Sequence, residues 1–180
     1  MKYTLVAGIA ALALSAAPVL AEAQSTTPPS TIQAKQEFIK SAAQDDMAEL
    51  ALGNLMKHKA TDAKVKQLAE RLVQDHSKDL AQVKQLAAEE HVVLPASPTE
   101  EQDALTQRLQ RLNGNQLEQE YLKAMVQGHQ ETIAAFQISA NQTQDNDLQL
   151  YAKRTLPILQ QHLKMAQEAQ NAVVGTSGRK

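Results

Sequence analysis

Residues 62–90 read DAKVKQLAERLVQDHSKDLAQVKQLAAEE, and apolar side chains recur along them at spacings of three and four. The positions that share this phase are Val65, Ala69, Leu72, His76, Leu80, Val83 and Ala87. Because about 3.6 residues complete one turn of an α-helix, these positions form a single face. The stretch therefore predicts one long amphipathic helix that begins at an Asp62 N-cap and carries a histidine in the middle of its buried face.

Three further long stretches show the same helical periodicity. They cover residues 31–59, 116–140 and 147–173, and no stretch alternates apolar and polar residues like a half-buried strand. Residues 91–99 contain two prolines and predict a loop, after which Thr99 and Gln102 predict a capping box that opens a short helix ending near Leu112. Pro157 lies inside the last stretch and predicts a kink or local break, because proline has no backbone N–H.

The short connections near residues 60–62 and 143–146 predict two antiparallel helical hairpins. The sequence therefore predicts an all-α fold, an antiparallel up-down-up-down four-helix bundle over residues 32–173. The short extra helix lies in the connection between the second and third long helices. In this arrangement both hairpin turns lie at the same end of the bundle.

The N-terminal 23 residues have the features of a secretory signal peptide. Lys2 precedes an almost entirely apolar run over residues 4–20, and small residues suit cleavage after Ala21 or Ala23. A membrane anchor is the weaker interpretation, because the run is short and Pro18 interrupts it. We expect a periplasmic or secreted protein without a transmembrane segment in its mature form, a flexible linker over residues 24–31 and a disordered tail over residues 174–180.

Composition excludes several classes of function. The chain has no Cys, so neither disulfides nor a lipid-modified cysteine is available. Its formal net charge of −2 provides no electrostatic footprint for nucleic acid or for an anionic membrane surface. No nucleophile elbow or glycine-rich phosphate loop is present, so we expect a protein that is not an enzyme.

Three histidines fall on the apolar faces of three different predicted helices: His76, His129 and His162. Counted from the end that holds both expected turns, His76 and His129 are nearly level, and a rise of about 1.5 Å per residue places His162 roughly 6 to 8 Å deeper. Glu49 on the first helix lies roughly 6 Å nearer that end. Phase and depth therefore predict that these four side chains converge in one central zone or in two adjacent layers.

One interpretation of this convergence is a metal site formed by His76, His129, His162 and Glu49. Imidazole and carboxylate ligands suit one transition-metal ion such as zinc, copper, iron or manganese. In a metal site, Asp79, one helical turn after His76, would be the better-placed partner to orient that ring. Ferritin-like di-iron proteins carry a Glu three residues before the ligand histidine on two helices. Val73 and Leu159 occupy those positions here, which disfavours a dinuclear iron centre.

Two other interpretations treat the histidines as part of the core. In a structural polar layer, each imidazole would bond to Glu49, Tyr121, Tyr151, Thr155 or a buried water. In an acid sensor, buried neutral histidines would take up protons as the pH falls through roughly 6.5 and loosen the bundle. Either would suit a non-enzymatic envelope or stress protein that acts by binding a protein partner. His58 and His91 fall at helix ends and are interpreted as structural or solvated.

Several short motifs together resemble one known family. They are Phe38-Ile39, Ala42-Ala43, Glu49, Leu52-Gly53 and Lys59-Ala60 in the first helix, Val65-Lys66, Asp75-His76 and residues 92–95 in the second helix and its loop, and Tyr121, Met125-Val126, His129, Leu156-Pro157 and His162-Leu163 in the last two helices. In these motifs the chain resembles the secreted bacterial family called domain of unknown function 4142. The resemblance extends from about Phe38 to Ala169. The resemblance implies an exported, ferritin-like helical bundle and implies no established activity. The family commonly has Asp before the third-helix histidine, where this chain has Gly128.

Overall fold

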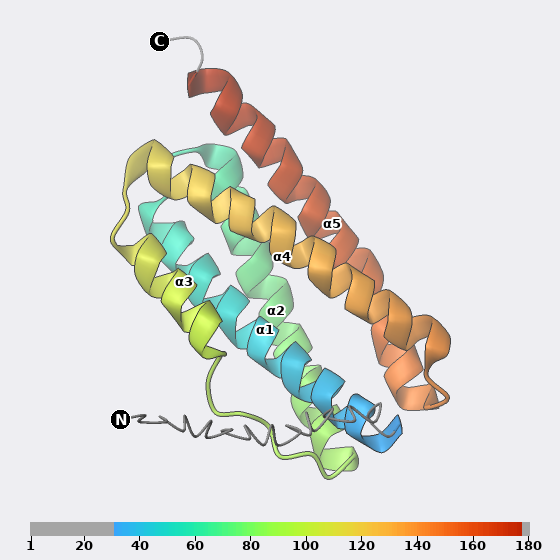
Figure 1. Cartoon of the computed structure of the whole chain (residues 1–180). Helices are drawn as coiled ribbons and strands as arrows, with labels where there is room; N and C mark the ends of the chain where they lie inside the picture. The colour runs from blue at the N-terminus through green and yellow to red at the C-terminus, as the bar shows by residue number, and fades with distance from the viewer. Residues whose placement is uncertain (1–30, 178–180) are drawn as a thin grey trace, which may run out of the picture.

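The computed structural model describes residues 31–177, and every regular element in this range is an α-helix. Figure 1 shows the five helices, which are α1 (Thr31–Lys59), α2 (Ala63–Glu89), α3 (Glu100–Gln110), α4 (Gly114–Gln142) and α5 (Asn146–Ser177). The all-α class and the five predicted helices are confirmed. The predicted signal peptide (residues 1–23) and nearly all of the linker (24–31) lie outside the described residues, as do the last three residues of the tail.

Local signals in the sequence fix where the helices begin. Asp62 is the N-cap of α2, and its side chain accepts hydrogen bonds from the backbone N–H groups of Lys64 and Val65. Thr99 and Gln102 form the predicted capping box of α3. At the other end of the chain the sequence predicts less well. Pro157 lies inside a continuous α5, which extends four residues past the predicted end at Val173.

The order of helix directions differs from the predicted up-down-up-down arrangement. α1 and α2 form one antiparallel hairpin and α4 and α5 another, but their turns lie at opposite ends of the bundle (Figure 1). At the start of α4, Glu118 accepts hydrogen bonds from the N–H groups of Thr61 and Asp62 in the α1–α2 turn, at 2.5 and 2.8 Å. Therefore α4 runs parallel to α2, and the order is up-down-down-up.

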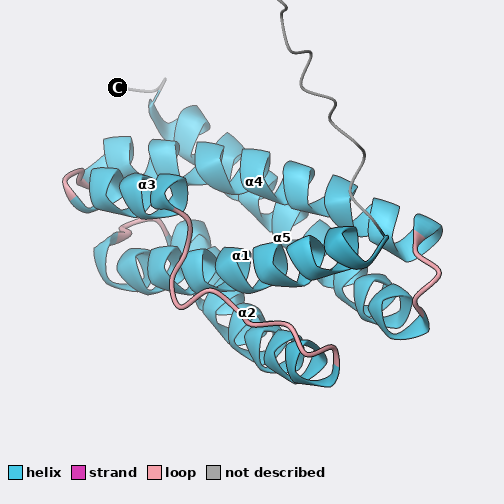
Figure 2. Ribbon diagram, turned by 60° about the horizontal axis from the view of Figure 1, so that its bottom comes forward, coloured by secondary structure: helices cyan, strands magenta, loops and turns pink. Residues whose placement is uncertain are grey.

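The connection between α2 and α4 explains this reversal. Figure 2 shows the loop after α2 running back along the bundle to α3, and α3 continues in the same direction. The whole connection thus returns the chain to the end where α2 began. The sequence predicts the loop and the short helix of this connection but not their course along the bundle, so the predicted direction of α4 is wrong.

The apolar core consists of two clusters, one towards each end of the bundle. The first includes the end of α1, the start of α2, the start of α4 and the end of α5, and its largest fully buried side chains include Met56, Leu68, Leu72, Tyr121 and Leu122. The second contains the opposite halves of the same four helices, with Ile39, Val83, Phe136, Tyr151 and Leu159 among its members. A polar layer between the two clusters contains the histidines.

The four long helices do not close completely around this core. The closely packed pairs are α1 with α2, α2 with α5, and α5 with α4, whereas α3 packs against α1 and α4.

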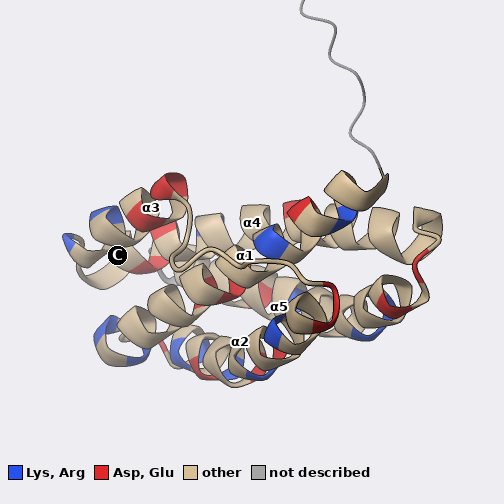
Figure 3. Cartoon of the chain, turned by 90° about the horizontal axis from the view of Figure 1, so that it is seen from below, with Lys and Arg blue, Asp and Glu red and all other residues tan. Residues whose placement is uncertain are grey.

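In Figure 3 acidic and basic segments alternate along the helices. Within residues 31–177, none of the helices is both long and apolar enough to cross a lipid bilayer.

Candidate metal centre

The three histidines come from three neighbouring helices at the same depth in the bundle. His76 lies about 13 residues after the start of α2, His129 about 15 after the start of α4, and His162 about 15 before the end of α5. These three helix ends share one end of the bundle, so at about 1.5 Å of rise per residue the histidines are all about 20 to 22 Å from it. The predicted 6 to 8 Å offset of His162 is wrong, because it assumed that both hairpin turns share an end.

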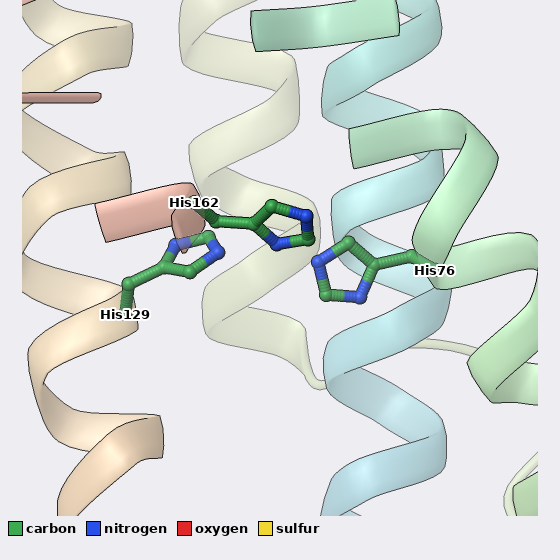
Figure 4. Close-up of side chains that lie close together, drawn as sticks. All are labelled: His76, His129 and His162. Atoms are coloured by element: carbon green, nitrogen blue, oxygen red, sulfur yellow. The ribbon is translucent and has the colours of Figure 1, made fainter. Parts of the chain in front are cut away.

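The three imidazole rings meet in the polar layer, as the sequence predicts. Their centroids are 5.2 Å apart for His76 and His162, 5.4 Å for His129 and His162, and 6.0 Å for His76 and His129. One ring nitrogen from each histidine lies within 4.8 Å of the other two. Figure 4 shows the rings pointing into a common space from three helices. All three residues are buried, with exposures of 5% or less.

Each histidine uses one ring nitrogen to bind a partner on the outer side of the cluster. The Nδ1 of His76 lies 2.8 Å from Asp46 Oδ1, and the Nε2 of His162 lies 3.0 Å from Asp75 Oδ2. The Nδ1 of His129 lies 3.0 Å from the carbonyl oxygen of Met125. Carbonyl and carboxylate oxygens accept hydrogen bonds, so these outer nitrogens carry the protons. The partners thereby fix both the orientation and the tautomer of the rings.

The other nitrogen of each ring is buried and has no hydrogen-bond partner among residues 31–177. These atoms are His76 Nε2, His129 Nε2 and His162 Nδ1. A buried polar atom without a partner destabilises a fold by roughly 1 to 3 kcal/mol, so three such atoms in one cluster require a reason. With the outer nitrogens protonated, the inner nitrogen of each neutral ring offers its lone pair to one shared ligand.

Glu49 lies beside the three-histidine group without belonging to it. Its Oε1 is 3.9 Å from His129 Nδ1, which is the outer nitrogen of that ring. Its other oxygen, Oε2, is buried and has no partner. Burial raises the pKa of Glu49, and the charge of His76 partly opposes this rise. The predicted fourth member is therefore adjacent to the site, on the side of α1.

The electrostatics of the cluster favour neutral imidazoles at His129 and His162. Burial, followed by the charge of His76, lowers the pKa of His129 to about 4 and that of His162 to about 3. Burial also lowers the pKa of His76, but the hydrogen bond to Asp46 and the charges of Glu49 and Asp46 outweigh it and raise the value. The cluster therefore resists a second proton, and two of its rings are in the form that binds metals.

Sequence reasoning missed both carboxylates that orient the rings. Asp75 directly precedes His76 and points away from it, but it binds His162 on the neighbouring helix and also pairs with Arg71. Burial raises the pKa of Asp75, yet the bonds from His162 and Arg71 outweigh that effect and lower it. Asp46 lies on another helix, 30 residues before His76, and no spacing along the sequence points to this contact. Helical spacing along one chain segment identifies neither of these cross-helix partners.

Four of the predicted partners, Asp79, Tyr121, Tyr151 and Thr155, do not bind the histidines. Asp79, predicted to bind His76, accepts hydrogen bonds from Tyr151 at 2.7 Å and from Thr155 at 3.2 Å. The hydroxyl of Tyr121 is buried without a hydrogen-bond partner. The polar layer thus contains a second, separate hydrogen-bonded set between α2 and α5, and the inner histidine nitrogens take no part in it.

Two cavities reach the cluster from different sides. The larger, of about 710 Å³, lies between α1, α3 and α4 and is lined by His76, His129 and Glu49 among others. The smaller, of about 280 Å³, lies between α2 and α5 and is lined by His76, His162 and Asp75 among others. The cluster is therefore buried and still adjacent to space on both sides.

In a second group of three acidic residues, two are paired with a lysine. Glu90, Asp145 and Asp147 place carboxylate oxygens close together near the α4–α5 turn. Lys35 forms an ion pair with Glu90 and another with Asp145, the latter at 2.8 Å. These contacts tie α1 to the ends of α2 and α4, and they explain the group as structural.

Comparison with known proteins places the chain in a family. The family model described as "Domain of unknown function (DUF4142)" matches residues 19–169. The chain belongs to the DUF4142 family. The resemblance noted in the sequence is thereby confirmed over nearly the whole bundle. No curated protein matches this DUF4142 chain.

A solved structure shares the fold of this DUF4142 protein. It is the crystal structure of a DUF305 fragment from Deinococcus radiodurans, with a TM-score of 0.69 and 14% sequence identity. The match covers 77% of this chain and 96% of the fragment. At this identity the similarity shows the arrangement of helices alone, so the site must be interpreted from its own geometry.

Proposed function

We propose that this protein binds one transition-metal ion through His76, His129 and His162. The observation that carries the proposal is that each ring offers one buried, unpartnered nitrogen to a space that all three share. Neutral imidazoles are ligands for zinc, copper, iron and manganese, and three protein ligands are the usual number where zinc keeps a position for another molecule.

A purely structural polar layer explains this arrangement less well. Such a layer should satisfy its own polar atoms, because an unpaired buried donor or acceptor is costly. The outer nitrogens are satisfied by Asp46, Asp75 and Met125, whereas all three inner nitrogens are left without a partner. Histidine ligands held by a carboxylate or carbonyl on the opposite nitrogen are the general pattern of metal sites in proteins.

We assign Glu49 as a carboxylate that lies beside the ligand set and compensates the charge of the ion. A buried dication requires negative charge nearby, which Asp46 and Asp75 supply through two histidines. The unpartnered Oε2 of Glu49 supplies it on the α1 side. The histidines and Glu49 therefore have different roles. Loss of a histidine should remove the metal site, whereas loss of Glu49 should weaken metal binding.

We further propose that the protein is exported and acts by binding rather than by catalysis. The apolar run over residues 4–20, followed by small residues at 21 and 23, supports export to the periplasm or beyond. The fold would be ferritin-like, because two antiparallel hairpins joined by one long connection are typical of that class. Mass spectrometry of the N-terminus of protein recovered from the envelope fraction tests cleavage after Ala21 or Ala23.

The metal proposal is tested by loading the purified apo protein with zinc, copper, iron or manganese and measuring bound metal by mass spectrometry after desalting. We expect one ion per chain for at least one metal. That metal should also raise the melting temperature, since a ligand at 100 times its Kd stabilises the folded state by about 2.7 kcal/mol. The triple variant H76A/H129A/H162A should retain no ion.

Matched variants separate the site from general histidine binding and from misfolding. The double variant H58A/H91A removes two exposed histidines and should load like the natural chain. The single variant H129L should stay folded by circular dichroism, because its outer hydrogen bond is to a carbonyl of its own helix, and it should lose the ion. Glu49→Gln should keep the stoichiometry with a higher Kd. Equal metal content in the natural chain and in H129L would overturn the proposal.

A further inference from the structure

The larger cavity reaches the three-histidine group from the side that has the fewest helix contacts. α1 and α4 are separated there by a space of about 710 Å³, which α3 borders. This volume lies within the range of roughly 300 to 1,000 Å³ that is typical of small-molecule sites. His76 and His129 line it, and the Nε2 of each ring is without a partner. A metal ion held by the histidines would therefore be close to the inner end of the cavity.

The described protein ligands do not surround such an ion. Among the described residues, no carboxylate joins the three histidines in the group whose ligand atoms lie within 4.8 Å of one another. Glu49 approaches His129 at the outer nitrogen, 3.9 Å from Nδ1, rather than at the inner one. Transition-metal sites with three protein ligands take a further ligand from outside, whereas structural zinc sites are closed by four protein ligands.

The charge of the cavity lining indicates which ligands can enter. Five carboxylates line it against two basic side chains, and these residues are Asp45, Glu49, Glu101, Glu120, Glu131, Arg108 and Lys123. An excess of one sign of charge in a cleft attracts ions of the opposite sign and repels those of the same sign. Neutral and cationic molecules are therefore favoured over anions. An ion held by imidazoles also accepts further nitrogen donors.

Gly128 leaves the cavity open beside His129, one of the three proposed metal ligands. It lines the cavity, it directly precedes His129, and a Cβ built on it meets no other atom within 4 Å. A larger side chain at this position would therefore extend into the cavity without disturbing the packing of α4. This provides a way to close the cavity while keeping all three histidines.

We propose that the cavity between α1, α3 and α4 is a binding site for a small neutral nitrogen donor, an imidazole or an unprotonated amine, that completes the coordination of the metal. The inference rests on the proposed metal site and adds its ligand class and its route of access. The smaller cavity between α2 and α5 is the competing route. It has two basic and two acidic side chains, Arg71, Lys78, Asp75 and Asp79, and would not distinguish ligands by charge.

The test uses the full chain loaded with cobalt(II), whose visible spectrum reports its coordination. Cobalt content is measured first, and imidazole and azide are then titrated separately at a pH where imidazole is neutral. Imidazole should change the spectrum with saturation, at a concentration at least tenfold lower than azide. Gly128→Leu should raise the imidazole concentration needed by at least tenfold without changing the cobalt content, whereas Gly128→Ala should leave the titration nearly unchanged. Glu131→Lys, at an exposed position on the lining, should narrow the difference between imidazole and azide.

Each failure has a distinct meaning. If the chain takes up neither cobalt nor any of the metals named above, the metal site and the cavity site are both overturned. A chain that takes up one cobalt ion and responds to neither probe keeps the metal site and overturns the cavity site. An imidazole response that is equal in the natural chain and in Gly128→Leu also overturns it, because the ligand then arrives by the other route.

Discussion

The carboxyl group of Asp45 is largely buried at the edge of the larger cavity. Burial, followed by the charge of Glu49, raises the pKa of Asp45 to about 6, although Gln102 donates a hydrogen bond to it at 2.7 Å. The pKa of Asp45 is higher in the folded protein than in the unfolded chain, so the protonated carboxyl group favours the folded state at low pH. This contribution to stability is lost as the pH rises through about 6. Above that pH the Asp45 carboxylate is charged in the folded protein, and its burial lowers the free energy of unfolding.

Asp45→Asn should therefore stabilise the apo protein at neutral pH. The substitution keeps a carbonyl oxygen for Gln102 and removes the charge, so we expect an increase of about 2 kcal/mol in the free energy of unfolding at pH 7.5. The increase should vanish near pH 4, where Asp45 is protonated in the folded natural chain. Urea unfolding at the two pH values measures the difference, and Glu70→Gln, at an exposed position, is the control. An equal effect of Asp45→Asn at both pH values would contradict the assignment of the buried charge.

Glu118 is a single residue that connects the two hairpins. Besides the two backbone N–H groups of the α1–α2 turn, its carboxylate accepts the hydroxyl of Thr61 at 3.0 Å. Glu118→Ala should lower the free energy of unfolding by about 2 to 3 kcal/mol, because it leaves three donors of the α1–α2 turn without their charged acceptor. Glu118→Gln retains one acceptor oxygen and should have a smaller effect in the same denaturant titration. Similar losses for the two variants would show that side-chain volume, rather than hydrogen bonding, is what matters at this position.

At the scale of helices, two glycines have opposite surroundings. Gly53 on α1 faces α2 so closely that an added Cβ would lie 2.7 Å from Val73 Cγ2 and 3.2 Å from the carbonyl oxygen of Ala69. Gly53→Ala should therefore destabilise the protein by about 1 to 3 kcal/mol, as overpacking usually does. Gly128→Ala should stabilise it by about 0.5 to 1 kcal/mol, because alanine suits a helix interior better and space is available. Thermal melts of the two variants with the natural chain test the contrast, which would be refuted by changes of the same sign.

The end of α2 contains a residue in an unfavourable backbone conformation. His91 has a φ of 54°, in the left-handed region, while the N–H groups of His91 and Val92 bond to the carbonyls of Ala88 and Ala87. This pairing is the Schellman motif, in which glycine is preferred at the left-handed position. His91→Gly should raise the stability by about 1 kcal/mol, as measured by urea unfolding. His58→Gly, within the last turn of α1, should lower it, because there glycine replaces a residue in helical conformation.

Helices and caps could be predicted from the sequence because they depend on neighbouring residues. The Asp62 cap, the Thr99 capping box and the buried phase of His76, His129 and His162 all follow from spacing within one helix. The partners of the rings do not, because Asp46 and Asp75 reach their histidines across helix interfaces. Which residues meet across an interface depends on the direction and depth of both helices, and neither is written in local periodicity.

At the scale of the whole molecule, the direction of α4 decides whether the histidines share one layer. With both hairpin turns at one end, His162 would lie one turn or more below the others. With α4 parallel to α2, the three depths agree to within a few residues. The length and course of the α2–α4 connection therefore bring the candidate site together, although that connection contributes no histidine to it. Helical phase alone therefore predicts that the three histidines converge, but it places His162 at the wrong depth.

The polar layer separates two apolar clusters, and a bound ion would join three helices across it. α2, α4 and α5 each supply one ligand, α1 supplies only Glu49, and α3 supplies none of the candidate ligands. Zinc or cobalt loading should therefore slow amide hydrogen exchange most strongly around residues 76, 129 and 162. The amides of α3 should change little, because this helix supplies no ligand and the ion would not oppose its local opening. Exchange measured by mass spectrometry on the apo and loaded protein tests this pattern, with H129L as the control that should show no change on addition of metal. Slowing confined to α3 and its neighbouring loop would contradict it, since an ion bound outside the histidine layer would then account for the effect.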